Sequence, residues 1–258
     1  MSESLPHEDQ TWFSSHLRQE MTLRTYGYRG KPMLAFPPQD GSFHDFENFG
    51  MVEQCRPFIE RGLLRLFSVG SVDAQSWTNH TIPPAERANR HEDYDAYIIT
   101  EVMPFIRKTC NSAARECLTT GCSMGAYHAA NFFFRHPECF DGTIAISGVY
   151  DLRTFIGDYM DRHVYFNSPL DYLSQISDRF YLDLYEKSRI IICVGQGAWE
   201  DEMLSDTRSL DAILRRMDIP AWVDYWGTDV SHDWPWWRKQ LTYFLSEIFD
   251  PQHSARAP

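Results

Sequence analysis

A series of short apolar runs, separated by stretches with helical periodicity, constrains the fold of this chain most strongly. Five of the runs are largely continuous, which is typical of parallel strands covered on both faces. Two others alternate apolar with polar residues, and we expect the earlier one near a sheet edge. The continuous runs are Met33–Phe36, Leu63–Val69, Cys117–Thr120, Thr143–Ile146 and Ile190–Val194, and the alternating runs are Met21–Tyr26 and Ala221–Trp226.

Between these runs, apolar residues recur at helical spacing in residues 94–106, 210–217 and 237–248. Pro104 interrupts the first stretch and predicts a kink there, while Pro220 follows the second and predicts its end. Strands that alternate with helices indicate βαβ units. Since no repeat or Gly/Ser-rich linker divides the chain, we predict one α/β domain over residues 1–258, with a mostly parallel sheet covered by helices on both faces.

Residues 150–188 lie between two predicted strands and are too long for a single crossover helix. The segment is rich in aromatic residues. Two interpretations follow: it packs against the domain as additional helices, or it is an inserted cap over a pocket.

Composition excludes some classes of partner. The chain of 258 residues carries 36 acidic and 24 basic side chains, a net charge of -12, so it would repel nucleic acids and anionic membranes. No apolar run approaches the length of a membrane span, and the first residues lack a signal-peptide pattern. The six cysteines form no C-x-x-C pair or metal-ligand cluster. We therefore expect a cytoplasmic protein with free thiols and with neither a metal nor an organic cofactor; its oligomeric state stays open.

The sequence Gly121-Cys122-Ser123-Met124-Gly125 matches G-x-S-x-G, and its setting makes the match informative. It follows a predicted strand and precedes a helical stretch, as a nucleophile elbow requires. Such a turn is tight, so the positions two before and two after the serine must be small. We predict that Ser123 is a nucleophile and that the Met124 backbone N–H stabilises an oxyanion.

A serine hydroxyl needs a base, and position in the chain selects one among ten histidines. His232 follows the last predicted strand and precedes the C-terminal helical stretch, which is where this chemistry places its histidine. His128 lies about one helical turn beyond the serine and is predicted to pack there. His44, His80 and His91 lie in loops or at a helix start and could touch a substrate.

The acid that orients the base should follow a strand between the serine and the histidine. After Ile190–Val194 the chain continues as Gly195-Gln196-Gly197 and then reaches Glu200 and Asp201. We predict Glu200, the first acid reached, with Asp201 as the alternative, because acids at a helix start also complement the helix dipole. Asp206 and Asp151 are more distant alternatives.

A second oxyanion donor is expected from the loop after an early strand. Here that loop is Pro37–Phe43, in which Gly41 lets the backbone approach a ligand closely. We favour the Ser42 N–H, with Gln39 and Asp40 as alternatives.

Three segments carry a resemblance to a known family. Residues 121–125, 195–200 and 232–237 resemble the Putative esterase group of α/β-hydrolases, which includes esterase D, enterochelin esterase and the mycolyltransferases. The likeness runs from about Leu23 to Leu245. It implies an α/β-hydrolase fold and acyl-ester chemistry, with the nucleophile in the first segment, the acid after the second and the base at the start of the third.

These observations predict a serine carboxylesterase that hydrolyses a small-molecule ester through an acyl-enzyme intermediate. One alternative is an acyltransferase, in which an alcohol replaces water. Another is a non-catalytic binding protein that keeps the fold, against which the filled positions of Ser123, Glu200 and His232 argue.

Overall fold

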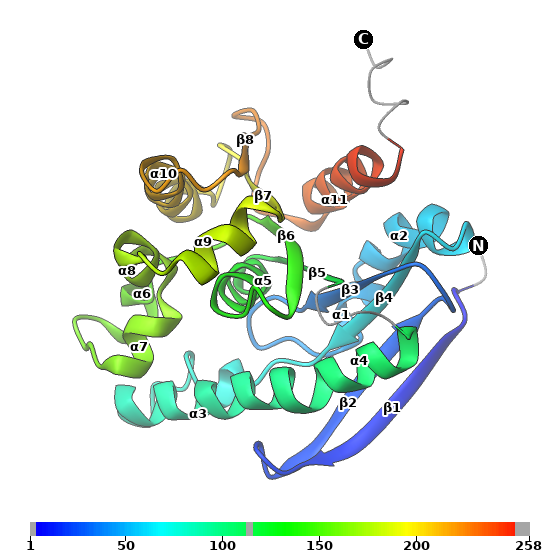
Figure 1. Cartoon of the computed structure of the whole chain (residues 1–258), viewed down its shortest axis with the longest axis horizontal. Helices are drawn as coiled ribbons and strands as arrows, with labels where there is room; N and C mark the ends of the chain where they lie inside the picture. Colours follow the sequence, from blue (N-terminus) through cyan, green and yellow to red (C-terminus); the bar gives the residue numbers. More distant parts are fainter. Residues whose placement is uncertain (1–3, 112–115, 251–258) are drawn as a thin grey trace.

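The computed structural model describes residues 4–111 and 116–250. A single sheet of eight strands forms its centre, in the order β1-β2-β4-β3-β5-β6-β7-β8 (Figure 1). β1, β2 and β4 pair antiparallel, whereas every pair from β4 to β8 is parallel, so the predicted mostly parallel sheet is confirmed. The strands are β1 His7–Ser14, β2 Gln19–Tyr26, β3 Lys31–Phe36, β4 Leu64–Val69, β5 Cys117–Cys122, β6 Phe140–Ile146, β7 Arg189–Val194 and β8 Trp222–Tyr225.

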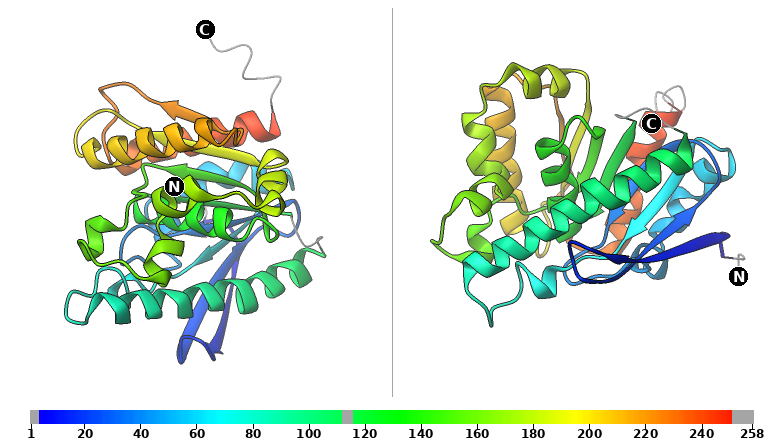
Figure 2. Two further views of the ribbon diagram at one scale, coloured as in Figure 1. Left: turned by 60° about the vertical axis from the view of Figure 1, so that its left-hand side comes forward. Right: turned by 60° about the horizontal axis from the view of Figure 1, so that its bottom comes forward.

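Helices cover both faces of this sheet, as predicted (Figures 1 and 2). α2 and α11 lie on one face, and α3, α4, α5 and α10 lie on the other. Successive side chains of a strand point to opposite faces, so Met33 and Leu34 enter different apolar cores. The helices are α1 Asp45–Asn48, α2 Met51–Glu60, α3 Pro84–Tyr97, α4 Met103–Cys110, α5 Met124–Arg135, α6 Arg153–Ile156, α7 Arg162–Asn167, α8 Pro169–Tyr172, α9 Arg179–Glu186, α10 Asp201–Arg216 and α11 Trp234–Phe249.

The irregularity predicted at Pro104 takes the form of a wider helical turn. A π-helical segment, Ile98–Val102, joins α3 to α4, and Pro104 lies in the first turn of α4. Proline has no N–H to donate to the carbonyl four residues earlier, and the wider turn accommodates that missing hydrogen bond.

The segment between β6 and β7 is helical and forms no strand. α7 contacts α3 and α5, while α8 contacts α5 and α10, so much of residues 150–188 packs against neighbouring helices (Figure 1). All six cysteines are free thiols, and five of them are buried. No helix within residues 4–111 or 116–250 has the length and apolar character needed to cross a membrane.

Candidate active site

Ser123 lies at a strained turn between β5 and α5. Its backbone has φ 58° and ψ −126°, a conformation that non-glycine residues rarely adopt. The Ser123 N–H donates to the Ile146 carbonyl at 3.0 Å, and the Ser123 carbonyl accepts from the Ala126 N–H at 2.9 Å. A Cβ on Gly121 would lie 2.2 Å from the Gly125 carbonyl oxygen, so the turn has no room for a side chain there.

The structure brings Ser123, His232 and Glu200 into one hydrogen-bonded chain. His232 Nε2 lies 3.0 Å from Ser123 Oγ, and His232 Nδ1 lies 3.2 Å from Glu200 Oε2. Glu200 is buried, and the His232 side chain is only 16% exposed. With a proton on Nδ1, the imidazole donates to the carboxylate and presents a lone pair at Nε2 to the serine hydroxyl.

Two glycines explain how the acid and the histidine meet. A Cβ on Gly195 or Gly197 would lie 2.3 or 2.7 Å from the Val230 carbonyl oxygen, so only glycine allows the two loops to cross this closely. The His232 N–H also donates to the Ala198 carbonyl at 2.9 Å. The backbone on both sides of the acid–histidine contact is therefore held by hydrogen bonds and close packing.

Ser147 is a member of this site that the sequence analysis did not single out. Its hydroxyl donates to Glu200 Oε1 at 2.6 Å, so both oxygens of the buried carboxylate have partners. Ser147 directly follows β6, has φ 56°, and donates its N–H to the Cys193 carbonyl at 2.7 Å. Its position after a strand, at the same sheet edge as Ser123, is the signal that could have identified it.

The other candidate acids lie outside this chain of hydrogen bonds. Asp201 is the exposed first residue of α10. Asp206 accepts from the N–H groups of Tyr150 and Asp151 at 2.6 and 2.9 Å, and burial raises its pKa despite these two hydrogen bonds. Asp151 pairs with Arg153 at 3.0 Å. These contacts give Asp206 and Asp151 structural partners away from the histidine.

Backbone N–H groups near Ser123 differ in whether they are already used. Met124 begins α5, and no acceptor for its N–H is found in residues 4–111 and 116–250. In the loop after β3, the Ser42 N–H donates to Asp45 Oδ2 at 2.8 Å, and the Asp40 N–H donates to Asp73 Oδ2 at 3.3 Å. An N–H that already faces a carboxylate is poorly suited to a developing negative charge. This contact weighs against Ser42, the donor that the sequence analysis favoured.

Gln39 is the remaining candidate in that loop. Within the described part of the chain its N–H has no acceptor. Pro38 and Gly41 close a turn through the Gly41 N–H and the Pro38 carbonyl at 2.9 Å, with Gln39 and Asp40 at its centre. The loop begins against the elbow, because a Cβ on Gly125 would lie 2.6 Å from the Pro37 carbonyl oxygen.

Two of the tryptophans after His232 make ring contacts that pack them at the start of α11. Trp237 meets the His232 ring edge-on, with ring centroids 4.8 Å apart, and is itself buried. Trp234 stacks on Phe49 at 4.3 Å. Both contacts fix the start of α11 beside the histidine.

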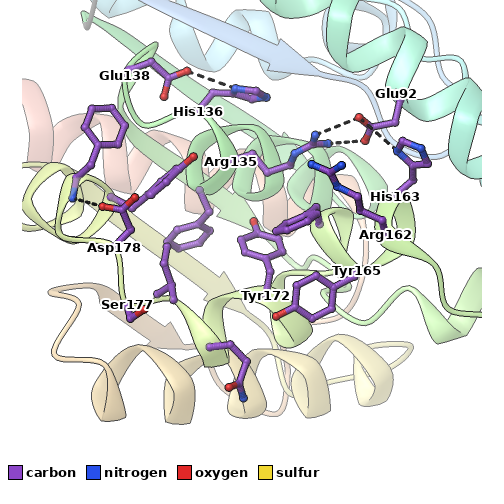
Figure 3. Close-up of a pocket in the computed structure, with 16 residues that line it drawn as sticks. Glu92, Arg135, His136, Glu138, Arg162, His163, Tyr165, Tyr172, Ser177 and Asp178 are labelled. Atoms are coloured by element: carbon purple, nitrogen blue, oxygen red, sulfur yellow. Dashed lines mark hydrogen bonds and ion pairs between the residues drawn. The ribbon is translucent and has the colours of Figure 1, made fainter.

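The segment of residues 150–188 divides into two parts. Leu152, Ile156 and Val164 join an apolar cluster with Met124, and Tyr159 packs against that cluster. The second part lines a cavity of about 830 Å³, to which Tyr165 and Tyr172 contribute (Figure 3). Phe166 also lines this cavity, whereas Ser123, Glu200 and His232 do not. The first part therefore shares an apolar cluster with Met124, the residue that follows Ser123.

The four other histidines singled out from the sequence have identifiable partners or surroundings. His128 is fully buried, as its predicted packing role requires, and its Nε2 lies 2.8 Å from Asp73 Oδ1. His91 is also fully buried and stacks on His128 at 5.5 Å. His44 Nδ1 lies 3.0 Å from Ser42 Oγ, and His80 Nδ1 lies 3.3 Å from an Arg87 nitrogen. Among the described residues, no group of three His, Cys, Asp or Glu side chains could hold a metal ion.

Comparison with known proteins places this geometry in context. A family model described as Putative esterase matches residues 66–248. A search of curated proteins gave no match. A ferulic acid esterase superposes with a TM-score of 0.72 at 17% identity, covering 95% of this chain and 98% of that one.

Two further solved structures have the same fold. S-formylglutathione hydrolase of Agrobacterium tumefaciens has a TM-score of 0.71 at 14% identity, covering 98% of this chain and 95% of its own. The fluorophosphonate-binding serine hydrolase F of Staphylococcus aureus has a TM-score of 0.66 at 15% identity, covering 94% and 98%. At these identities the similarity establishes the α/β-hydrolase fold of this chain.

Proposed function

The chain belongs to the Putative esterase family, and from that membership we propose that it is a serine carboxylesterase acting on a small-molecule ester through an acyl-enzyme. The observation that carries this proposal is the chain of hydrogen bonds from Ser123 through His232 to Glu200. Its members lie at 123, 200 and 232, in the order serine, acid, histidine that this fold uses.

In the first step Ser123 Oγ attacks the ester carbonyl while His232 Nε2 accepts the hydroxyl proton. The 3.0 Å separation is within reach for that transfer. The imidazolium that forms is stabilised by the Glu200 carboxylate, which stays ionised and holds the ring in orientation. Collapse of the tetrahedral intermediate then releases the alcohol, which takes its proton from His232.

The oxyanion of that intermediate is stabilised by two backbone N–H groups. We assign the first to Met124, at the positive end of α5. We assign the second to Gln39 in place of Ser42, because Ser42 and Asp40 already donate to carboxylates. Water then gives a proton to His232 as it attacks the acyl-enzyme carbonyl. The bond to Ser123 Oγ breaks, His232 returns the proton to that oxygen, and the carboxylic acid is released.

The same chemistry admits an acyltransferase if an alcohol replaces water as the acceptor, and a non-catalytic binding protein if the serine is inert. Competition between water and added alcohols during turnover of a nitrophenyl ester measures the first alternative. The second alternative predicts no turnover and no labelling of Ser123 by a fluorophosphonate.

Three further features belong to the proposal. We propose one domain, since every strand from β1 to β8 joins a single sheet. The part of residues 150–188 that packs near Met124 would act as the cap over the acyl site. The six free thiols favour a reducing compartment and hence the cytoplasm.

The proposal is tested by Ser123→Ala. We expect kcat for short nitrophenyl esters to fall roughly 10³-fold or more with the melting temperature nearly unchanged, because the hydroxyl acts in the transition state. Wild-type protein should be labelled by a fluorophosphonate and the variant should not. A folded Ser123→Ala protein with full esterase activity contradicts the assignment.

A further inference from the structure

We infer that Asp73 and His128 form a buried positioning pair that connects the nucleophile helix α5 to the loop after β3 and holds that loop in its oxyanion-binding shape. The inference rests on the proposed function, since it concerns how the second oxyanion donor is placed. The hydrogen bonds that join Ser123, His232 and Glu200 do not involve Asp73 or His128. Both are therefore proposed as positioning residues, which would act through the loop after β3.

Asp73 is the centre of the arrangement. It is 1% exposed and begins a short 3₁₀ turn after β4. Its two carboxylate oxygens face different elements: Oδ1 lies 2.8 Å from His128 Nε2 on α5, and Oδ2 accepts from the Asp40 N–H at 3.3 Å. A buried carboxylate is costly unless hydrogen-bonded, so both contacts define where it can lie.

The loop after β3 contains a residue in an unfavourable backbone conformation. Asp40 has φ 56°, in the left-handed region that is unfavourable for residues other than glycine. Such a conformation persists only when the surroundings determine it. Here the Thr78 hydroxyl also donates to Asp40 Oδ1 at 2.6 Å, and the Ser71 N–H donates to the Gly41 carbonyl at 3.1 Å. The segment after β4 thus holds the turn at three points.

His128 connects Asp73 to α5, the helix that begins directly after Ser123. It is fully buried on α5, one turn after Ser123, and its Nδ1 has no partner among the described residues. An imidazole with its proton on Nε2 fits this environment, because it donates to Asp73 and leaves Nδ1 as an unused lone pair. A shift of α5 therefore moves Asp73, and with it the turn that presents Gln39.

The direct test measures kcat and KM of three variants: Asp73→Asn, His128→Leu and His128→Gln. Leucine removes the side-chain N–H that faces Asp73, whereas glutamine keeps a side-chain N–H donor. We expect kcat to fall roughly 10–100-fold in Asp73→Asn and His128→Leu, since small displacements of a catalytic group have effects of this size. KM should stay within about threefold, because oxyanion donors act mainly in the transition state. His128→Gln should restore most of the rate.

His91→Phe is the matched control. His91 is buried in the same aromatic cluster and stacks on His128, but no hydrogen bond in the described residues joins its ring to Asp73 or to the loop after β3. This variant should alter the melting temperature without altering kcat. If His91→Phe and His128→Leu lower kcat equally, general packing explains the effect and the pair has no special role.

A double-mutant comparison identifies the route of the effect. Gln39→Pro deletes the proposed N–H donor, so adding Asp73→Asn to it should cost little further rate if Asp73 acts by placing that donor. Losses that multiply in full overturn the inference, as does wild-type kcat in Asp73→Asn. Failure of the proposed function is distinguishable, because then the wild-type protein itself shows neither ester turnover nor fluorophosphonate labelling, and the inference falls with it.

Discussion

Both oxygens of the buried Glu200 carboxylate have hydrogen-bond partners, which fixes the orientation of this side chain. Its Oε1 accepts from the Ser147 hydroxyl at 2.6 Å and its Oε2 faces His232 at 3.2 Å. A buried carboxylate with both oxygens engaged has little freedom to turn away from the imidazole. Asp201, one residue later, is exposed at the start of α10, where its charge complements the helix dipole.

This difference predicts an asymmetric pair of variants. Glu200→Gln should leave the fold intact but lower kcat by roughly 10⁴, as loss of the charge of a triad acid does. Asp201→Asn should keep nearly the full rate and lose at most about 1 kcal/mol of unfolding free energy. Steady-state kinetics and thermal melts of both purified proteins provide the check; a large rate loss in Asp201→Asn alone would reverse the assignment.

The Gln39 N–H can be removed without removing the turn. Gln39 occupies the first central position of the turn closed by Pro38 and Gly41, where proline is well tolerated. Gln39→Pro should therefore fold, yet lose roughly 10²–10³ in kcat if its N–H stabilises the oxyanion. Gln39→Ala keeps the N–H and serves as the control. Equal rates for both variants would return Ser42 to consideration.

Burial determined which strands could be predicted from the sequence. β3 to β7 are continuous apolar runs and were predicted to within a few residues. β1 was not predicted, because His7–Ser14 is polar and almost wholly exposed at the sheet edge, so it carries no apolar pattern. α1 and α2 were not predicted either; they follow the loop after β3, and Pro57 interrupts the helical pattern of α2.

For the residues of the candidate site, position in the chain determined what could be predicted. Ser123, His232 and Glu200 could be predicted to meet because strand order and a turn motif fix their positions in the chain, and their side chains do form one hydrogen-bonded chain. Ser147 and Asp73 could not, because their roles depend on contacts 53 and 55 residues away in the sequence. The preference for Ser42 failed to anticipate the Asp45 carboxylate that takes its N–H.

The two parts of residues 150–188 should behave differently in specificity. Tyr159 packs on the cluster that contains Met124, whereas Phe166 lines the cavity of about 830 Å³, whose lining does not include Ser123. Tyr159→Ala should change the ratio of kcat/KM between short and longer acyl esters by roughly 10-fold or more, the effect of about one methylene of pocket contact. Phe166→Ala should leave that ratio unchanged. A shift in melting temperature alone for Tyr159→Ala would make the whole segment structural.

A cluster of charged side chains lies just beyond the C-terminal end of α5, beside the cavity of about 830 Å³. His136 Nε2 lies 2.8 Å from Asp95 Oδ2. On the other side of the ring, His136 Nδ1 lies 3.4 Å from Glu138 Oε1 (Figure 3). Burial opposes the charged imidazole, but the hydrogen bonds to Asp95 and Glu138 outweigh it and raise the pKa of His136 to about 9. The histidine is thus a cation that links α5 to α3 at neutral pH.

A raised pKa makes this link depend on pH in a defined direction. An unfolded histidine has a pKa of about 6.5, so the folded state binds the extra proton between about 6.5 and 9. The stability from this proton is fully present below about pH 6.5 and is lost as pH rises through 9. A shift of this size corresponds to at most about 3.5 kcal/mol.

We therefore expect His136→Gln to lower the melting temperature most at pH 6 and to approach the wild-type value near pH 10. Glutamine keeps hydrogen-bonding groups but cannot take the charge, so the comparison isolates the proton. His163→Gln is the matched control, because His163 lines the same cavity, is 45% exposed, and lies 3.8 Å from Glu92. Thermal melts of the three proteins from pH 6 to 10 provide the measurement. A deficit in His136→Gln that is the same at every pH would mean that the folded protein holds this imidazole neutral, and the link between α3 and α5 would then be one of packing.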